Sequence, residues 1–373
     1  MVKTNPQNDC SVKLRVGVIG AGAISDIYLS NMINRFDNLE VVCVAARHIE
    51  RAKVKAEKYG VKACTTDELL KDESIDMVVV LTPVGTHYEL IKEALLAGKH
   101  VYTEKTMTDD PAKAKELLDI ANEKGLYLGA APDTFLGGAW QNARASVDKG
   151  LLGEIHSFVI SGNRDNDVLT GMFPFLREKG AGILYDYCVY YMTTLVSILG
   201  PVAEVSGMLQ TPYTKRVGII KDTPDFGKEY ETPNESEVAA VIRLENGITG
   251  TLHVDAESNA SDRSFYAIYG TKGILYLTDP NGFGGDILFY PNPKNWDEVV
   301  PEKIDIYKDF CDNSRGIGPS EMADAIINKR PCRPSKEMAY HVLEILAGIM
   351  ESNEKHEFVK IESTCERPEA RSI

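Results

Sequence analysis

Positive charge is in short supply in this 373-residue chain, which has 41 Lys and Arg residues against 55 Asp and Glu residues. The formal net charge of −14 is the opposite of what a surface that tracks nucleic-acid phosphates requires. Long apolar runs are also missing, because the densest cluster, Val78–Leu81, is far shorter than the ~20 residues that span a bilayer. We therefore expect neither a nucleic-acid partner nor a membrane partner.

Cysteine pairs are missing too, since the seven cysteines are scattered and form no CxxC motif. An odd, scattered set favours reduced thiols over a disulfide framework and offers no zinc-site spacing. The first twelve residues are polar and lack the apolar segment of a signal peptide. We expect a cytoplasmic protein without a metal site. Its length and its 43% of hydrophobic residues suit about two globular domains.

Short apolar runs alternate with amphipathic segments in the first third of the chain, which is typical of βαβ units and a parallel sheet. The expected strands are Leu14–Ile19, Leu39–Ala46, Ile75–Leu81, His100–Thr103 and Leu126–Ala130. Thr65 and Glu68 form a capping-box pattern at the start of a short helix. We predict an α/β protein whose residues 1–133 form a Rossmann dinucleotide-binding domain.

The pattern changes after about residue 155, where short strands are joined by tight turns such as Glu245-Asn246-Gly247. Consecutive hairpins indicate a large, mostly antiparallel sheet. We therefore expect residues 134–373 to form an α+β domain for substrate binding and oligomerisation, with helices over Gly182–Leu199 and Ser335–Ser352.

Two further features of this second domain carry expectations. Residues 213–235 are polar and contain prolines, which predicts a long mobile loop. Alternating apolar residues predict an exposed sheet face that needs a partner, and these residues are Val238, Ala240, Ile242 and Leu244.

A glycine-rich turn, Gly20-Ala21-Gly22-Ala23-Ile24-Ser25, follows the first expected strand and opens a helix. The first glycine permits the tight turn, and the second lets backbone N–H groups approach a pyrophosphate at the helix N-terminus. Such a turn also serves simply to connect a strand to a helix, but the βαβ context favours dinucleotide binding. The expected cofactor contacts here are Gly20, Gly22, Ala23 and Ile24.

The end of the second strand bears on the choice of cofactor. NAD sites place a carboxylate there for the ribose diol, whereas this chain has Ala46 and Arg47, with Arg51 close behind. A guanidinium suits a 2′-phosphate, so NADP is favoured and NAD is the alternative. The alternative is that Arg47 is only a solvent-exposed residue at the end of a strand and binds no cofactor.

Polar residues end the later strands, at the carboxyl edge where open α/β sheets bind ligands. They are Thr82, Pro83, His87, Glu104 and Lys105. A lysine in an enclosed cleft can donate to a substrate hydroxyl and depress the pKa of a neighbouring acid. The alternative is that Glu104 and Lys105 form an ion pair on the surface, and their spacing fits this interpretation at least as well.

Asp186 and Tyr190 are four residues apart in the second domain, so a continuous helix would place them on one face. A phenol needs a nearby cation to act as a base near neutral pH, and Lys105 could supply it. From the helical spacing alone, the alternative that Tyr190 simply packs in the core is favoured.

Taken in order along nearly the whole chain, these segments resemble the glucose–fructose oxidoreductase/inositol dehydrogenase/rhizopine-catabolism (Gfo/Idh/MocA) family. Two departures stand out, since Thr106 replaces the proline of the family's Glu-Lys-Pro and Tyr190 replaces a frequent histidine. Glucose–fructose oxidoreductase and the dihydrodiol dehydrogenases look similar in pairing a lysine with a tyrosine. The dihydrodiol enzymes also resemble this chain in the Ala-Ala-Arg after strand two, and they use NADP.

The resemblance implies an NAD(P)-dependent oxidoreductase that transfers hydride between nicotinamide and a secondary alcohol of a sugar or glycoside, with the 3-hydroxyl as the expected position. The implied catalytic residues are Lys105, Tyr190 and Asp186, and the implied substrate contacts are Lys105, Asp133, Arg164, Asp186 and Tyr190. Thr82, Pro83, His87, Glu104 and Lys105 join the cofactor contacts.

A nucleotide that stays bound and is recycled is a related expectation. A non-catalytic NAD(P)-sensing regulatory protein on the same scaffold is the alternative. The resemblance also implies a homo-oligomer assembled through the second domain's sheet.

Overall fold

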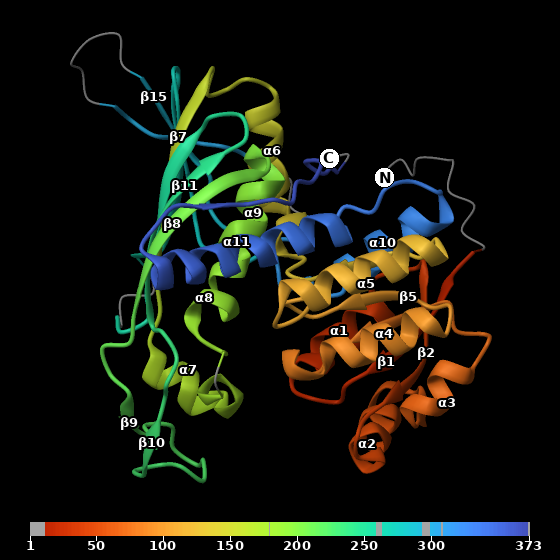
Figure 1. The fold of residues 1–373 in the computed structure, drawn as a ribbon. Coiled ribbons are helices and arrows are strands. Elements are labelled where there is room, and N and C mark those ends of the chain that lie inside the picture. Colours follow the sequence, from red (N-terminus) through yellow and green to blue (C-terminus); the bar gives the residue numbers. More distant parts are fainter. Residues whose placement is uncertain (1–11, 179, 259–262, 293–298, 307–308, 372–373) are drawn as a thin grey trace. The chain divides into compact units, whose positions relative to one another are not determined.

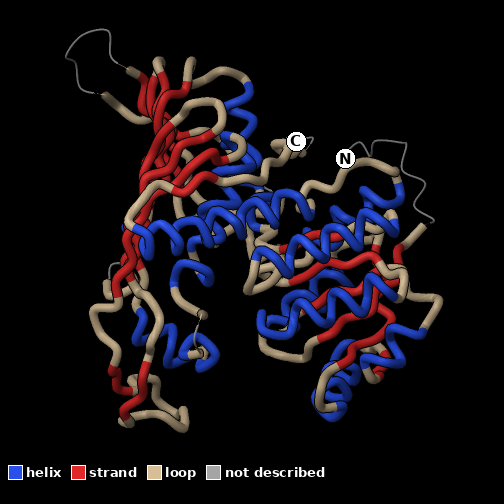
Figure 2. Tube along the Cα trace, in the orientation of Figure 1, coloured by secondary structure: helices blue, strands red, loops and turns tan. Residues whose placement is uncertain are grey.

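The computed structural model describes residues 12–178, 180–258, 263–292, 299–306 and 309–371. The chain folds as two units. The first contains the residues up to Met107, together with Ala112–Asp133 and Ser314–Lys336. The second contains Thr108–Pro111, Thr134–Asn313 and the residues from Glu337 on. Figure 1 labels the elements of both units, and Figure 2 marks their helices and strands.

The first unit is built on a parallel sheet, whose strands follow the order β3-β2-β1-β4-β5-β6 within the described residues. The strands are β1 (Leu14–Ile19), β2 (Leu39–Ala45), β3 (Lys62–Cys64), β4 (Met77–Val80), β5 (His100–Thr103) and β6 (Leu128–Ala130). The helices are α1 (Ile24–Asn34), α2 (Ile49–Tyr59), α3 (Thr66–Lys71), α4 (His87–Leu96), α5 (Pro111–Lys124) and α10 (Ile317–Ile327). Every residue of β4 is buried, as in parallel sheets with both faces covered. The expected Rossmann fold is confirmed.

Local signals in the sequence set several of these boundaries. The Thr65 side chain accepts the N–H of Glu68, and the Glu68 side chain accepts the N–H of Thr65, so the predicted capping box is confirmed. Helix α2 ends at Gly60, whose φ of 69° suits a glycine C-cap. The three-residue strand β3 was not predicted, because so short a strand carries no periodic pattern.

Residues 314–336 pack with the first unit, although the sequence assigns the whole of 134–373 to the second domain. Asp133 accepts the backbone N–H groups of Gly316 at 3.0 Å and Gly318 at 3.1 Å. Helix α10 follows this connection and packs on β5 and β6. The sequence could not reveal the return, because the residues that hold it are 183 and 185 positions apart.

The second unit is built on a mixed sheet with the strand order β16-β15-β14-β13-β7-β12-β11-β8-β17. The strands are β7 (Ile155–Asn163), β8 (Val202–Gln210), β11 (Glu237–Leu244), β12 (Thr249–Asp255), β13 (Phe265–Gly270), β14 (Gly273–Leu277), β15 (Leu288–Pro291), β16 (Glu302–Lys303) and β17 (Val359–Lys360). Among the described strands, β7 and β12 are parallel and the other neighbours are antiparallel. The predicted large, mostly antiparallel sheet is confirmed.

Helices cover one face of this sheet. They are α6 (Gly138–Asp148), α7 (Asn166–Met172), α8 (Ile183–Asp186), α9 (Cys188–Leu199) and α11 (Lys336–Lys355). Every residue of α9 is buried. Helix α11 packs on β8, where the His341 Nε2 accepts the Val202 N–H at 2.9 Å. In the described ranges, no helix combines the length and the apolar character of a membrane span.

The alternating apolar residues of β11 face the core, which corrects the expectation that they form an exposed face. Val238, Ala240, Ile242 and Leu244 are all at most 7% exposed. The intervening residues Ala239, Val241 and Arg243 are exposed instead. The physical reason is that the more apolar of the two faces is the one that the helices bury.

Residues 213–235, where the sequence predicts a long mobile loop, form an arm that carries its own two-stranded sheet. Strands β9 (Lys215–Val217) and β10 (Glu229–Glu231) pair in antiparallel fashion. Arg216 forms an ion pair with Asp167 of α7 at 2.8 Å and a second one with Glu257. Long-range charge pairs of this kind leave no local signature in the sequence.

Candidate active site

The glycine-rich turn after β1 is shaped by two glycines with different roles. Gly20 has φ +124°, and a Cβ there would lie 2.7 Å from the backbone of Leu81, so only glycine fits. At Gly22, a Cβ would meet no described atom within 4 Å. Gly22 therefore leaves open space in front of α1, where a ligand can approach the backbone closely.

Helix α1 begins beside this space. Ala23 is its N-cap residue, and within the described residues no side chain caps it. The N–H groups of Ser25 and Asp26 bond to the carbonyl oxygens of Gly22 and Ala23 at 3.3 Å, and the positive end of the helix still favours an anion. These features fit the pyrophosphate of a dinucleotide.

Two arginines follow the carboxyl end of β2, where a dinucleotide's adenosine ribose lies in Rossmann folds. Arg47 and Arg51 are both exposed, and Ala46 is half-buried. Among the described residues, neither guanidinium has a hydrogen-bonding or ion-pairing partner. Two uncommitted cations at this position fit a phosphorylated ribose.

His87 does not present its ring to a ligand, although the sequence predicts a cofactor contact for it. The side chain is fully buried. Its Nδ1 lies 2.8 Å from the Thr106 carbonyl oxygen, and its Nε2 lies 2.7 Å from that of Thr82. Burial lowers the pKa of the imidazole. A neutral ring donates to only one of these two oxygens, and His87 thus packs between the loop after β4 and the loop after β5.

Glu104 and Lys105 follow β5 directly. The Glu104 carboxylate accepts the Tyr28 hydroxyl at 2.7 Å and the backbone N–H of Lys105 at 3.1 Å. Glu104 is therefore committed to holding the start of its own loop. The Lys105 side chain is half-buried.

The helix that carries Asp186 and Tyr190 is broken between them, which corrects the expectation of one continuous helical face. Helix α8 ends at Asp186, Tyr187 is the junction residue with φ −119°, and α9 begins at Cys188. The Tyr190 N–H bonds to the Tyr187 carbonyl oxygen at 3.1 Å, a spacing of three residues. The relative placement of Asp186 and Tyr190 is thus set by this break.

Asp186 lines a small cavity of about 10 Å³ in the second unit, together with Thr170, Asn234 and Glu235. Burial raises the pKa of Glu235. Its Oε1 also accepts the Leu184 N–H at 3.1 Å in α8. The polar side chains of Thr170, Asn234 and Glu235 thus lie near Asp186, and each already bonds to backbone groups.

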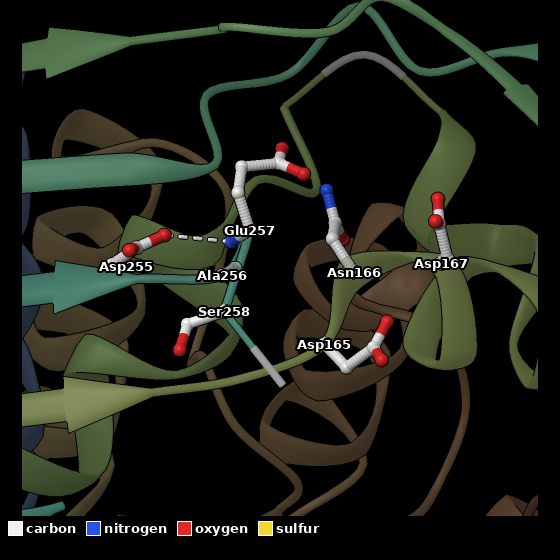
Figure 3. A pocket seen from close by; sticks show the side chains of 7 residues that line it. All are labelled: Asp165, Asn166, Asp167, Asp255, Ala256, Glu257 and Ser258. Carbon is white, nitrogen blue, oxygen red and sulfur yellow. Dashed lines mark hydrogen bonds between the residues drawn. The ribbon is translucent and has the colours of Figure 1, made fainter. Parts of the chain in front are cut away.

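A second, larger cavity of about 510 Å³ lies at the carboxyl ends of β7 and β12 (Figure 3). Its lining residues are Asp165, Asn166, Asp167, Asp255, Ala256, Glu257 and Ser258. Asp165 also caps α7 through the Val168 N–H, and Asp255 accepts the N–H of Glu257. Asn166 lines both cavities, so α7 connects them.

Family models match both parts of the chain. Residues 14–131 match the model described as "Oxidoreductase family, NAD-binding Rossmann fold", and residues 140–276 match the "GFO/IDH/MocA C-terminal domain". The chain belongs to the Gfo/Idh/MocA oxidoreductase family. An oxidoreductase class and a nicotinamide cofactor follow from this membership.

Two curated relatives of this Gfo/Idh/MocA protein are named for reactions at the 3-position of a sugar or glycoside. It is 32% identical to the D-glucoside 3-dehydrogenase of Escherichia coli over 361 residues, covering 92% of this chain and 96% of that protein. It is 33% identical to the dTDP-3,4-didehydro-2,6-dideoxy-alpha-D-glucose 3-reductase of Streptomyces violaceoruber, covering 74% and 80% of the two chains.

Solved structures of low sequence identity share the fold. Levoglucosan dehydrogenase in complex with NADH and levoglucosan matches with a TM-score of 0.82 at 19% identity, over 94% of this chain and 100% of that one. An NAD-binding oxidoreductase from Klebsiella pneumoniae matches with a TM-score of 0.80 at 21% identity, over 94% and 99% of the two chains.

Two residues expected to contact substrate have protein partners. Asp133 is 1% exposed and holds the backbone of residues 316–318. Burial raises its pKa to about 6. Arg164 forms an ion pair with Asp279, and its guanidinium lies 3.9 Å from the centre of the Tyr187 ring.

The structure divides the three expected catalytic residues of this Gfo/Idh/MocA protein between its units, with Lys105 in the first and Asp186 and Tyr190 in the second. Sequence reasoning missed Glu235, Tyr187 and Asp279. Tyr187 lies inside the motif already singled out, whereas Glu235 and Asp279 come from distant segments and carry no local signal.

Proposed function

We propose that the protein is an NAD(P)-dependent dehydrogenase acting on a secondary alcohol of a sugar or glycoside, with the 3-hydroxyl as the reacting position. The observation that carries the proposal is that both parts of the chain match models of an oxidoreductase family, the first with an NAD-binding Rossmann fold. The 32% identity to the D-glucoside 3-dehydrogenase supports the 3-position.

In this proposal, Tyr190 removes the proton from the reacting hydroxyl, and Lys105 stabilises the phenolate and the developing alkoxide. Asp186 accepts hydrogen bonds from the sugar hydroxyls and fixes the ring. The nicotinamide, when bound, supplies the hydride acceptor for oxidation or the hydride donor for reduction. Tyr190 is 8% exposed, so little of this residue is open to bulk water.

NADP is the cofactor that we propose, because Arg47 and Arg51 lie uncommitted at the end of β2. The Arg47→Ser, Arg51→Ser double variant should lose affinity for NADPH while its affinity for NADH changes by less than about twofold. Fluorescence titration of both nucleotides measures the difference. Equal losses for the two nucleotides would contradict the proposed 2′-phosphate contact.

The catalytic roles are tested with a panel of glycosides and 3-keto sugars. Lys105→Met and Tyr190→Phe should each lower kcat by about 100-fold or more and leave nucleotide affinity nearly unchanged. Near-normal turnover in Lys105→Met would remove that residue from the mechanism. Tight NADP binding with no turnover on any sugar by the native protein would favour a regulatory sensor instead.

A nucleotide that is retained and recycled by a second sugar is a further part of the proposal. The purified protein should then absorb in the reduced-nicotinamide band before any cofactor is added. A protein spectrum free of that band would contradict recycling and leave the dehydrogenase proposal intact.

We also propose a homo-oligomer that associates through the open face of the second unit's sheet. Support comes from the exposed side chains of Val241 in β11 and Met208 in β8, which are 44% and 72% exposed. Phe265 and Tyr276 stack on neighbouring strands of the same sheet.

A further inference from the structure

The helix break at Tyr187 separates two residues that have to act on one substrate. In a continuous helix, residues four apart lie on one face with their Cβ atoms ≈ 5–6 Å apart. Here the N–H of Tyr190 bonds to residue 187, and Tyr187 leaves the helix with φ −119° and ψ −42°. The contacts that hold the Tyr187 backbone therefore also determine how Asp186 and Tyr190 are oriented relative to each other.

The Tyr187 side chain is anchored by a charged pair from elsewhere in the second unit. Its hydroxyl donates to the Asp279 carboxylate, and the same carboxylate oxygen accepts a guanidinium N–H of Arg164. The Arg164 guanidinium also lies over the Tyr187 ring, 3.9 Å from its centre. Each of the three residues thus contacts the other two.

This cluster is itself fixed by backbone groups. The second Asp279 oxygen accepts the Asn281 N–H at 3.0 Å, and Arg164 donates to the carbonyl oxygen of Asn163 at 3.1 Å. Asp279 follows β14 and Arg164 follows β7, so the ends of two strands hold the helix junction. The cluster is also largely shielded, because Tyr187 is 3% exposed and the Arg164 side chain 17% exposed.

A second phenol extends the contact along α9. Tyr191 is fully buried, and its hydroxyl donates to the Tyr187 hydroxyl at 3.3 Å. The Tyr187 and Tyr190 rings lie 6.2 Å apart, between centres. The chain of contacts therefore runs from Asp279 through Tyr187 to the residues on either side of Tyr190.

We propose that Tyr187, Asp279 and Arg164 are positioning residues, which hold the break between α8 and α9 so that Asp186 orients the same sugar that Tyr190 deprotonates. This inference rests on the proposed dehydrogenase function. It gives Arg164 a role besides the expected substrate contact, because its guanidinium contacts both Asp279 and Tyr187.

The first test removes single groups from the cluster. Tyr187→Phe deletes only the hydroxyl, and Asp279→Asn deletes the charge that Arg164 pairs with. Each should lower kcat on the glycoside by about 10- to 100-fold with a smaller change in KM, because misalignment costs most in the transition state. The double variant should lose no more than the worse single variant, since the two groups act as one unit.

The pH dependence of kcat/KM distinguishes a positioning role from a general loss of folding. If Tyr190 moves away from the cation that stabilises its phenolate, the pH at which kcat/KM reaches its plateau should rise by about one unit. Tyr266→Phe is the matched control, because Tyr266 is a fully buried tyrosine of the same unit whose hydroxyl has no partner in the described structure. The control should leave kcat and the pH profile unchanged.

Hydrogen–deuterium exchange of the peptide covering residues 183–191 tests the anchor without any turnover. Tyr187→Phe and Asp279→Asn should speed exchange there at least several-fold, and Tyr266→Phe should not. Exchange that is unchanged in both variants would overturn the proposal. So would a folded Tyr187→Phe protein with native kcat and pH profile.

The two proposals fail in different ways. A native protein that oxidises and reduces no sugar would refute the dehydrogenase function, yet the exchange data would still decide whether the cluster holds the helix break. An active native protein with unaffected variants would refute the positioning role alone.

Discussion

At the scale of single residues, buried polar side chains in this protein are committed to backbone groups far away in the sequence. Asp133 holds the start of the returning segment through Gly316 and Gly318, and His87 bridges the carbonyl oxygens of Thr82 and Thr106. Such side chains look functional in a sequence, because acids and histidines are the groups that catalysis uses. Burial with fixed partners gives them a structural role.

Asp133 should make stability depend on pH. Its folded pKa of about 6 lies above the ordinary 3.8, so the folded state binds this proton more tightly than the unfolded chain does. The stabilisation is fully present below about pH 4 and is lost as pH rises through 6, a loss of about 3 kcal/mol. Urea unfolding at several pH values measures it.

Asp133→Asn should remove this component while keeping an oxygen acceptor for the two N–H groups. The variant should therefore gain stability relative to the native protein between pH 4 and pH 7. Asp119→Asn, which removes an exposed carboxyl from α5, serves as control and should show no such gain. A parallel pH dependence in Asp133→Asn and the native protein would contradict the assignment.

The two glycines of the turn after β1 should respond differently to alanine. Gly20→Ala forces a Cβ against Leu81 at φ +124°, so the free energy of unfolding should fall by about 2 kcal/mol or more. Gly22→Ala meets open space and should leave stability within about 0.5 kcal/mol, while nucleotide affinity drops at least about tenfold. Thermal unfolding and nucleotide titration of both variants check the contrast.

At the scale of elements, the arm of residues 213–235 is held in place by ion pairs with residues outside it. The Arg216 side chain is 3% exposed and pairs with Asp167 and Glu257. Arg177 pairs with Asp225 at 2.7 Å and lies over the Tyr230 ring. The segment's prolines and polar residues suggest a loop, but they are compatible with short strands when ion pairs of this kind stabilise those strands.

Arg216→Met should release the arm. Removing the cation leaves Glu257, whose side chain is 15% exposed, without its partner, and this should cost about 3 kcal/mol of local stability. Limited proteolysis should then cut within 213–235 faster. Arg243→Met is the control, because its pair with Glu204 is exposed and contributes at most about 1 kcal/mol. Equal proteolysis in the two variants would show that Arg216 does not hold the arm.

At the scale of the whole molecule, the open face of the second sheet is the surface on which copies of the chain are proposed to associate. The β11 residues that point to this face are Ala239, Val241 and Arg243, one position removed from the apolar set singled out in the sequence. Because side chains alternate along a strand, a shift of one residue exchanges the two faces completely.

Val241→Glu should weaken this association. A charge in the middle of an apolar contact is costly to bury, so the mass in solution should fall towards that of one chain. Light scattering coupled to size-exclusion chromatography measures it. Val217→Glu changes an equally exposed valine of the arm and should leave the mass unchanged. A native protein that is already monomeric would refute the proposed oligomer.

Local patterns in the sequence determined much of this protein. The short apolar runs between amphipathic segments, the glycine turn and the capping box of Thr65 and Glu68 predicted the Rossmann sheet, the start of α1 and the start of α3, because each depends on neighbours within a few residues. Tertiary structure decided the rest. The return of residues 314–336, the face that β11 buries and the break at Tyr187 all depend on contacts between distant segments, whose partners no local pattern specifies.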